Sequence, residues 1–167
     1  SKNMDQVDRI LAQWQAERPE LDVAPMGTMG RLNRLTLHLS QEVERVIAEH
    51  GLTPASFDVL ATLRRSGPPY ALTPSALVEW TMVTSGTMTN RIDRLERAGM
   101  VTRTRNPEDG RGFVVGLTEE GFRLIDAAVT AHAANQHRLL AALSADERVD
   151  LDRLLAKWLA AFEAGDP

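Results

Sequence analysis

The spacing of the hydrophobic residues changes period on either side of Gly99, and this change limits the fold more than any other feature. Over residues 85–98 the apolar side chains recur at three- and four-residue steps, which predicts an amphipathic helix that ends at Gly99. Residues 100–105 and 113–117 instead alternate, and they are rich in Val, Thr and Phe. Because turn-forming residues lie between these two segments, they predict a β-hairpin with a polar tip.

Two further helices precede this one, and each begins with a Thr-Pro pair. Thr is a favourable N-cap and Pro is favourable in a first turn, so residues 53–54 and 73–74 mark helix starts. A polar turn at residues 84–86 leads into the helix over 85–98. Two helices joined by a tight turn and followed by a two-stranded wing form a winged helix-turn-helix.

Long amphipathic patterns flank this central segment. A connector bracketed by Pro19 and Pro25 separates the first two of them. Together they carry more apolar surface than so small a central segment would cover, which predicts a dimer interface. We expect these helices over residues 4–17, about 28–50, about 118–143 and from 145 to near the end of the chain.

The expected fold is therefore mainly α-helical with a small β-hairpin, and it has three parts. Residues 1–50 form N-terminal helices that serve dimerisation, and residues 51–118 form the winged helix-turn-helix lobe. Residues 119–167 form C-terminal dimerisation helices.

The net charge of the chain is −4, but its positive charges are concentrated in one segment. Residues 84–111 contain six arginines and four acidic residues, so this segment alone is +2. Most of the acid lies elsewhere, and a cationic face for DNA is compatible with the acidic composition. The same charges also suit any solvated helix, so they support a DNA face without requiring it.

Other classes of function are excluded by what the sequence lacks. Without cysteine there are no disulfides, thiolate metal sites or thiol redox sensors. The spacing of His132 and His137 places them on different helix faces, so we expect no metal site. In the absence of a catalytic motif or a phosphate-binding loop, we expect neither an enzyme nor a cofactor. With no apolar run of about 18 residues and no charged-then-apolar leader, we expect a cytoplasmic protein without membrane association.

The helix over 85–98 has the two faces that a recognition helix needs. Met88, Ile92 and Leu95 form its core stripe, while its opposite face is small and polar at the start and cationic further on. Hydroxyl and amide groups can reach base edges in a major groove, and arginines can bind phosphates or guanine. Taken alone, the helix equally suits a solvated surface, but the hairpin that follows favours DNA. We predict DNA contacts from Ser85, Thr87, Thr89, Asn90, Arg94 and Arg97, and from Arg111 at the hairpin tip.

Asp109 lies two residues before Arg111 in the same tip. We expect its carboxylate to orient the Arg111 guanidinium through a hydrogen-bonded ion pair.

Three stretches together resemble the MarR family of transcription regulators. They are residues 90–101, 106–111 and 117–121, and the resemblance extends over nearly the whole chain. It implies a homodimer that binds double-stranded DNA at a pseudo-palindromic site and usually represses nearby genes. One departure is Gly110, which stands where a basic residue is commoner.

A narrower resemblance is to the urate-responsive, PecS-like group within that family. It is carried by the extra helix over residues 4–17 and by stretches at 14–22, 57–60, 63–70 and 85–91. The resemblance implies that urate or a related purine weakens DNA binding. It also implies that the ligand site, with the extra helix as one wall, is lined by Trp14, Asp58, Arg91 and Arg103.

The residues themselves support part of this site. Arg91 lies beside the core stripe of its helix, and Asp58 lies between Phe57 and Val59 on a largely apolar helix. Unpaired charges are costly in such places, so each needs a partner. The two side chains can therefore form a ligand pocket or a purely structural ion pair. Trp14 can likewise be core packing, and Arg103 alone indicates nothing.

Two other functions are compatible with a winged helix. One is a dimerisation lobe of an enzyme, but the chain is too short to contain the catalytic part and lacks its glycine motif. The other is a dimeric adaptor that uses the winged helix for protein contacts and has no specific DNA binding.

Overall fold

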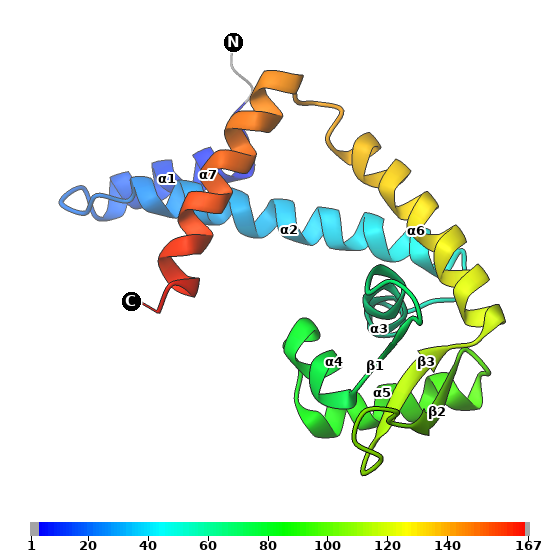
Figure 1. Ribbon diagram of the computed structural model, residues 1–167. Coiled ribbons are helices and arrows are strands. Elements are labelled where there is room, and N and C mark those ends of the chain that lie inside the picture. The colour runs from blue at the N-terminus through cyan, green and yellow to red at the C-terminus, as the bar shows by residue number, and fades with distance from the viewer. Residues whose placement is uncertain (1–3, 166–167) are drawn as a thin grey trace. The chain divides into compact units, whose positions relative to one another are not determined.

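The computed structural model describes residues 4–165 and confirms a mostly helical chain with a small antiparallel sheet (Figure 1). Within that range the elements follow the expected order, with one additional strand. They are α1 (Gln6–Glu17), α2 (Ala24–Ala48), α3 (Pro54–Arg65), β1 (Ala71–Leu72), α4 (Pro74–Thr81), α5 (Ser85–Arg97), β2 (Val101–Arg105), β3 (Phe113–Leu117), α6 (Glu119–Leu139) and α7 (Ala145–Glu163).

Contacts divide the chain into two compact units, Ser1–Arg45 and Val46–Pro167. In the second unit, α3, α4, α5 and the start of α6 pack around the sheet. The largest fully buried side chains of this core are Ile47, Leu60, Leu63, Leu77, Met88, Ile92 and Ile125.

The sheet has the strand order β1-β3-β2, with both pairs antiparallel. The predicted hairpin is present, and Arg105 faces Phe113 next to its tip. Strand β1 was not expected, because two residues are too short to show a period. It pairs Ala71 with Gly116 and Leu72 with Val115, which joins the loop before α4 to the wing.

The threonine caps predicted from the sequence are confirmed. The Thr53 hydroxyl accepts a hydrogen bond from the Ser56 N–H at 3.1 Å and begins α3. Thr73 and Thr84 cap α4 and α5 in the same way. Each cap satisfies one of the backbone donors that a helix start leaves unpaired, which fixes where these helices begin.

The start of α6 is held against the end of α5. The Thr118 hydroxyl donates to the Gly99 carbonyl at 2.7 Å and accepts from the Gly121 N–H at 3.0 Å. A Cβ atom added at Gly121 would lie 2.0 Å from the Met100 carbonyl oxygen. Only glycine allows this approach, so Gly121 fixes α6 beside the end of α5 and the start of β2.

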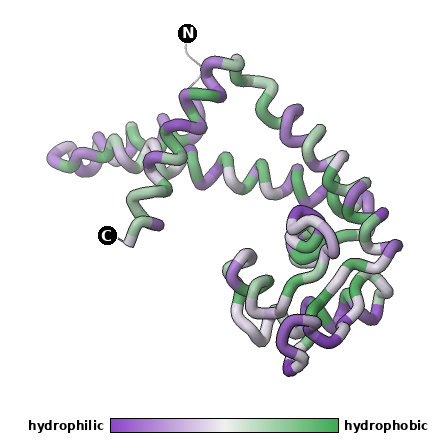
Figure 2. The backbone as a smooth tube through the Cα atoms, in the orientation of Figure 1, coloured by the Kyte–Doolittle hydropathy of each residue, from purple (hydrophilic) through white to green (hydrophobic). Residues whose placement is uncertain are grey.

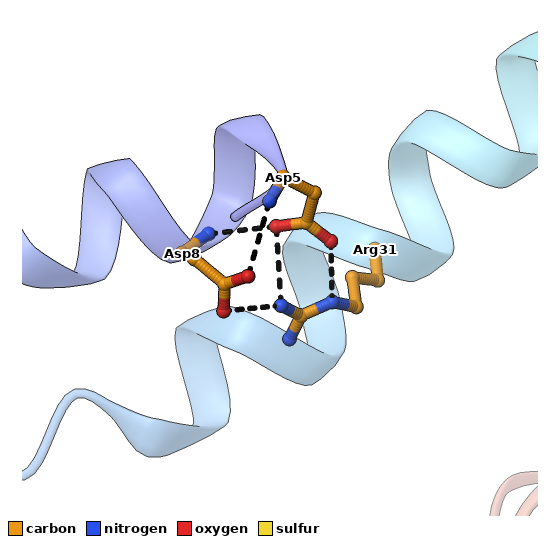
Figure 3. Close-up of polar contacts among 3 residues, drawn as sticks. All are labelled: Asp5, Asp8 and Arg31. Carbon is orange, nitrogen blue, oxygen red and sulfur yellow. Dashed lines mark hydrogen bonds and ion pairs between the residues drawn. The ribbon is translucent and has the colours of Figure 1, made fainter. Parts of the chain in front are cut away.

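In the first unit, an arginine of α2 joins α1 to α2. Arg31 binds the carboxylate of Asp5, the N-cap of α1, and reaches Asp8 at 2.7 Å (Figure 3). A backbone hydrogen bond from Asp8 and the Arg31 guanidinium lower the pKa of the Asp5 carboxyl. The exposed pairs act together with the burial of Val7 to hold the extra helix in place.

The expected start of the second helix was wrong. Helix α2 begins at Ala24, not near residue 28, because Pro25 belongs to its first turn and not to the connector. The Asp22 carboxylate accepts the Ala24 N–H at 3.1 Å and supports this earlier start.

Helix α7 exposes nearly all of its hydrophobic side chains in the single chain. Figure 2 shows hydrophobic positions recurring along this helix. Leu154, Leu159 and Phe162 are more than half exposed, although α7 is a regular helix with a Ser144–Glu147 capping box. Among the described residues, no helix is both long and apolar enough to cross a membrane.

Candidate nucleic-acid interface and ligand site

Helix α5 divides into a buried and an exposed face as the sequence predicts. Met88, Ile92 and Leu95 are buried in the core. The side of the helix expected to meet DNA is exposed, and it carries Ser85, Thr87, Thr89, Asn90, Arg94 and Arg97. The helix therefore presents hydroxyl and amide groups near its start and guanidinium groups near its end.

Hydrogen bonds within the first turns orient this polar face. The Thr84 hydroxyl donates to the Thr87 hydroxyl at 2.9 Å, and the Thr89 hydroxyl donates to the Ser85 carbonyl at 3.0 Å. The cap of α5 is thus part of the same surface as the predicted base-contacting residues. Hydroxyl groups that already have one local partner still offer lone pairs or rotate to suit a base edge.

The wing tip is a compact turn. The Asn106 N–H donates to the Gly112 carbonyl at 2.9 Å, and the Gly110 N–H donates to the Asn106 carbonyl at 3.0 Å. Gly110 has φ +67°, a left-handed conformation that the commoner basic residue would adopt at a cost. The departure from the family pattern therefore suits the backbone of this tip. Arg111 lies exposed beside it.

The expected link between Asp109 and Arg111 takes a different form. The Asp109 carboxylate accepts a hydrogen bond from the Arg111 backbone N–H at 2.9 Å. The structure thus gives Asp109 a contact with the backbone of Arg111, where an ion pair with its guanidinium was expected. A carboxylate two residues before an N–H readily closes such a turn, so Asp109 shapes the tip that carries Arg111.

Arg103 fastens the first wing strand to the recognition helix. Its guanidinium binds Glu96 at 2.7 Å and also contacts Asp93, while its backbone N–H donates to Glu96 at 3.1 Å. The same guanidinium lies 5.3 Å from the centre of the Phe113 ring. The hydrogen bond to Asp93, followed by the one to Glu96, raises the pKa of Arg103. Arg103 is therefore a charged clamp between β2 and α5.

Arg91 and Asp58 come together across α5 and α3. Arg91 Nη1 lies 3.7 Å from Asp58 Oδ2, with the arginine side chain 22% exposed and the aspartate 45%. This distance is an ion pair but is too long for a hydrogen bond. The pair predicted from the sequence is thus formed, and it is loose enough for an anion to compete for the guanidinium.

Arg103 does not complete this pair. With about 100° per residue along a helix, its partners Asp93 and Glu96 lie across α5 from Arg91. Of the three residues in the second unit that were predicted to bind the ligand, the structure therefore brings Arg91 and Asp58 together, and it pairs Arg103 with other residues. Strand alternation places Arg103 on the same face as buried Val101, but it does not identify Asp93 and Glu96 as its partners.

A cavity of about 320 Å³ adjoins Arg91 in the second unit. Arg91 and Arg94 supply charge to it, and Thr53 and Ser56 supply hydroxyls. Its remaining wall is mostly apolar, formed by Gly51, Leu52, Ala55, Leu95, Ala98, Met100 and Leu124. Two guanidinium groups beside an apolar wall suit a small aromatic anion. The sequence pattern did not indicate this role for Arg94.

Trp14 lies in the first unit, on α1, and its side chain is 41% exposed. It lines a surface hollow of about 450 Å³ together with Gln13, Ala16 and Glu17. The side chain that packs α1 is instead Val7, so Trp14 is not simply core.

A half-buried histidine on α6 packs against α3. The His132 ring is centred 5.0 Å from the Phe57 ring, and its Nδ1 is buried without a hydrogen-bond partner in the described part of the chain. Burial lowers the pKa of His132. No pattern in the sequence indicated it, because a single histidine on an amphipathic helix has no distinctive spacing.

Comparison with known proteins identifies relatives over most of the chain. Residues 50–112 match the MarR family. The chain is 41% identical over 152 residues to the HTH-type transcriptional regulator PecS of Dickeya dadantii, which covers 91% of this chain and 92% of that protein.

Two solved structures share the fold. A mutant MarR protein of E. coli in complex with operator DNA superposes with a TM-score of 0.70 at 28% identity, over 82% of this chain and 95% of that one. BpsR of Bordetella bronchiseptica, whose DNA binding is regulated by 6-hydroxynicotinic acid, has a TM-score of 0.67 at 27% identity. That match covers 77% of this chain and 90% of BpsR.

Proposed function

Because the chain belongs to the MarR family of DNA-binding transcription regulators, we propose that it is a homodimeric repressor whose DNA binding is released by a small anionic ligand such as urate. The homodimer binds a pseudo-palindromic operator through the two copies of α5 and their wings. The observation that carries the ligand response is the ion pair between Arg91 of α5 and Asp58 of α3.

The repressor role rests on where the DNA surface lies. A protein that covers a major groove near a promoter blocks RNA polymerase sterically, so it needs no additional surface that contacts the polymerase. The polar start of α5, its arginines and the exposed wing tip supply contacts for such coverage. This combination favours a DNA-binding repressor over a dimeric adaptor. An adaptor that binds only proteins does not need a helix face with hydroxyl groups at its start and guanidinium groups at its end.

The ligand acts through charge. Arg91 has one loose carboxylate partner, so a planar anion with two adjacent acceptor atoms, such as a carbonyl oxygen and a deprotonated ring nitrogen of urate, can offer its guanidinium better, paired acceptors. The cavity beside Arg91 has apolar walls for the flat faces of a purine and hydroxyls for its edge. A relative whose DNA binding is regulated by 6-hydroxynicotinic acid, also a small heteroaromatic acid, supports this ligand class.

Binding is coupled to DNA because Arg91 belongs to the recognition helix. A ligand that draws Arg91 away from Asp58 tilts or shifts α5, and the clamp at Arg103 carries the wing with it. The spacing of two such helices in a dimer must match about one turn of DNA. The ligand therefore favours a state with weaker DNA affinity, to the extent that it binds that state more tightly.

The test is a gel shift on the intergenic DNA upstream of the gene, with and without urate. Urate should weaken wild-type binding about 5- to 150-fold. Arg91→Ala and Asp58→Ala should remain folded, retain some DNA binding and lose most of that response. Arg123→Ala, an exposed arginine on α6, is the matched control and should respond as wild type.

Calorimetry of urate with the free protein completes the test. Absence of urate binding to the wild type, or full urate sensitivity in Arg91→Ala, leaves Arg91 and Asp58 as a structural ion pair only. Trp14→Ala belongs in the same series, because the family resemblance assigns Trp14 to the ligand wall. Arg103→Ala tests whether this residue binds the ligand, as the resemblance implies, or transmits its effect. A transmitting residue leaves the calorimetric affinity for urate unchanged.

A further inference from the structure

The turn between α4 and α5 contains a strained methionine. Met82 has φ +57° and ψ +34°, and its N–H closes α4 on the Val78 carbonyl at 3.0 Å. This left-handed position is the one that glycine adopts most easily, because a Cβ atom there crowds the backbone. The geometry of the turn explains why φ is positive at position 82, but it does not explain why this position is occupied by a methionine.

A second residue with the same φ provides a comparison. Tyr70 also has φ +57°, and its ring packs edge-on against Phe122 at 4.9 Å and under the Arg64 guanidinium at 5.4 Å. Internal contacts therefore offset the strain at Tyr70. The Met82 side chain is 89% exposed, so packing inside the protein does not offset its strain. Strain that the fold does not explain is a reason to look for a contact outside the molecule.

The position of Met82 indicates which contact that is. It lies two residues before Thr84, the N-cap of α5, and so borders the polar start of the recognition helix. In a major groove the apolar feature of a base edge is the C5-methyl group of thymine. A thioether side chain is flexible and apolar, and it adapts to such a surface without a fixed geometry.

We infer that Met82 is an additional DNA-contacting residue, whose side chain packs against thymine methyl groups in the major groove. This inference rests on the proposed function, because it requires α5 to lie in that groove. A protein partner is the other occupant such an apolar side chain suits, particularly with Trp80 also exposed nearby in the chain. Continuity with the DNA-facing start of α5 favours DNA.

The experiment compares two versions of one duplex, the shortest upstream DNA that the wild type binds. One version contains thymine, and the other has every thymidine replaced by 2′-deoxyuridine, which lacks the methyl group. Wild-type affinity should fall about 4-fold for each methyl group that Met82 covers. Met82→Gly and Met82→Asn should bind the thymine duplex more weakly than the wild type does. When uracil replaces thymine, they should also lose less affinity than the wild type loses.

The melting temperature separates contact from structure. Gly and Asn both tolerate a left-handed backbone, so each variant should melt at or above the wild-type temperature while binding DNA more weakly. Met4→Ala removes another exposed methionine, in the other compact unit, and should change neither quantity. A merely structural role for Met82 predicts that stability and binding fall together, and that result overturns the inference.

Two further outcomes also overturn it. One is unchanged affinity for the thymine duplex in Met82→Gly, and the other is an equal uracil penalty in the variant and the wild type. Either outcome leaves the proposed function intact if Arg94→Ala and Arg97→Ala still weaken binding. If those variants bind as wild type, the placement of α5 on DNA is itself wrong.

Discussion

At the scale of single residues, the arginines of α5 have different surroundings on its different faces. Arg94 and Arg97 are exposed, whereas Arg91 is largely covered and paired with Asp58. A guanidinium in solvent attracts any phosphate within reach, but a covered one responds only to the anion that enters beside it. Under the proposed function, Arg91 therefore serves the ligand and Arg97 serves DNA, while Arg94 is exposed towards DNA and also lines the cavity.

The exposed arginines give the first prediction. Arg94→Ala and Arg97→Ala should each weaken DNA binding, because each removes a cation that displaces counterions from phosphate. The slope of log K against log salt should become shallower by about one for each phosphate that the variant no longer neutralises. Filter binding or anisotropy at several salt concentrations measures both quantities.

Arg123→Ala serves as the control for the salt slope, since it removes the same charge from α6. The DNA surface assigned to α5 is wrong if neither variant changes the slope. Arg94 also lines the cavity, so Arg94→Ala has a second expected effect, a weaker urate response, that Arg97→Ala lacks.

His132 gives a prediction about pH. Because burial lowers its pKa below the ordinary value of 6.5, the folded protein binds a proton less readily than the unfolded chain. The stability that depends on neutral His132 is complete above pH 6.5 and is lost as the pH falls from there towards the folded-state pKa. The melting temperature should therefore decline between pH 7.5 and 5.

His132→Leu should show a smaller decline over the same range, since it cannot take up a proton. His137 is exposed on the same helix, and His137→Leu should keep the wild-type dependence. An identical pH profile in His132→Leu and the wild type would exclude His132 as the source of the effect.

At the scale of secondary-structure elements, local signals predicted most boundaries. Caps such as Thr53 and Ser144, the glycine at 99 and the change from a helical to an alternating period each act within a few residues. Three expectations failed. Helix α6 ends at Leu139 and not near residue 143, because the chain forms hydrogen-bonded turns over residues 140–143. Strand β1 exists only because β3 lies beside it. The start of α2 depended on whether Pro25 belongs to the connector or to the first turn of the helix.

The candidate site was less predictable than the fold for a physical reason. Side chains such as Arg91 and Asp58 show by their position on apolar helices that they need partners, and they proved to be partners of each other. Arg103 lies on a short strand, and its partners come from a helix that only the packed lobe brings near. Spacing along the chain shows which charged side chains lie on an apolar face and so need a partner. It does not show which residue of another element supplies that partner.

The clamp between β2 and α5 gives a prediction at this scale. Arg103→Ala should destabilise the fold by about 1 kcal/mol, since partly exposed charged hydrogen bonds contribute modestly. That loss corresponds to a fall of about 2–4 °C in melting temperature for a chain of this size. Arg103→Lys should restore little of it, because an ammonium cannot bind Asp93 and Glu96 with the planar fork of a guanidinium.

Arg105→Ala on the same strand is the matched control, since Arg105 is exposed and its loss should leave the melting temperature nearly unchanged. Full rescue by lysine would indicate that charge alone matters at position 103. In that case the guanidinium is not a geometric link between wing and helix.

At the scale of the whole molecule, α7 presents an apolar face that the described part of the single chain leaves exposed. A stripe of apolar side chains runs along it at three- and four-residue steps, and every residue of the helix except the half-buried Arg148 is exposed. The members of the stripe are Leu151, Leu154, Leu155, Trp158, Leu159 and Phe162. A continuous exposed stripe of this length is costly in water, and a second copy of the same helix covers it most simply.

The last prediction follows from that stripe. Leu155→Glu combined with Leu159→Glu should convert a dimer at micromolar concentration into a folded monomer, because two carboxylates per chain would have to be buried in the interface. Sedimentation measures the mass, and Ala160→Glu on the opposite face is the control that adds a carboxylate without entering the stripe. The monomer should bind the upstream DNA about 100-fold or more weakly, since it loses the second half-site and with it the gain from linked binding. A variant that is monomeric and yet binds as tightly as wild type would show that one α5 suffices. It would also remove the basis for ligand release, because a tilt of α5 weakens binding only when two helices must keep their spacing on DNA.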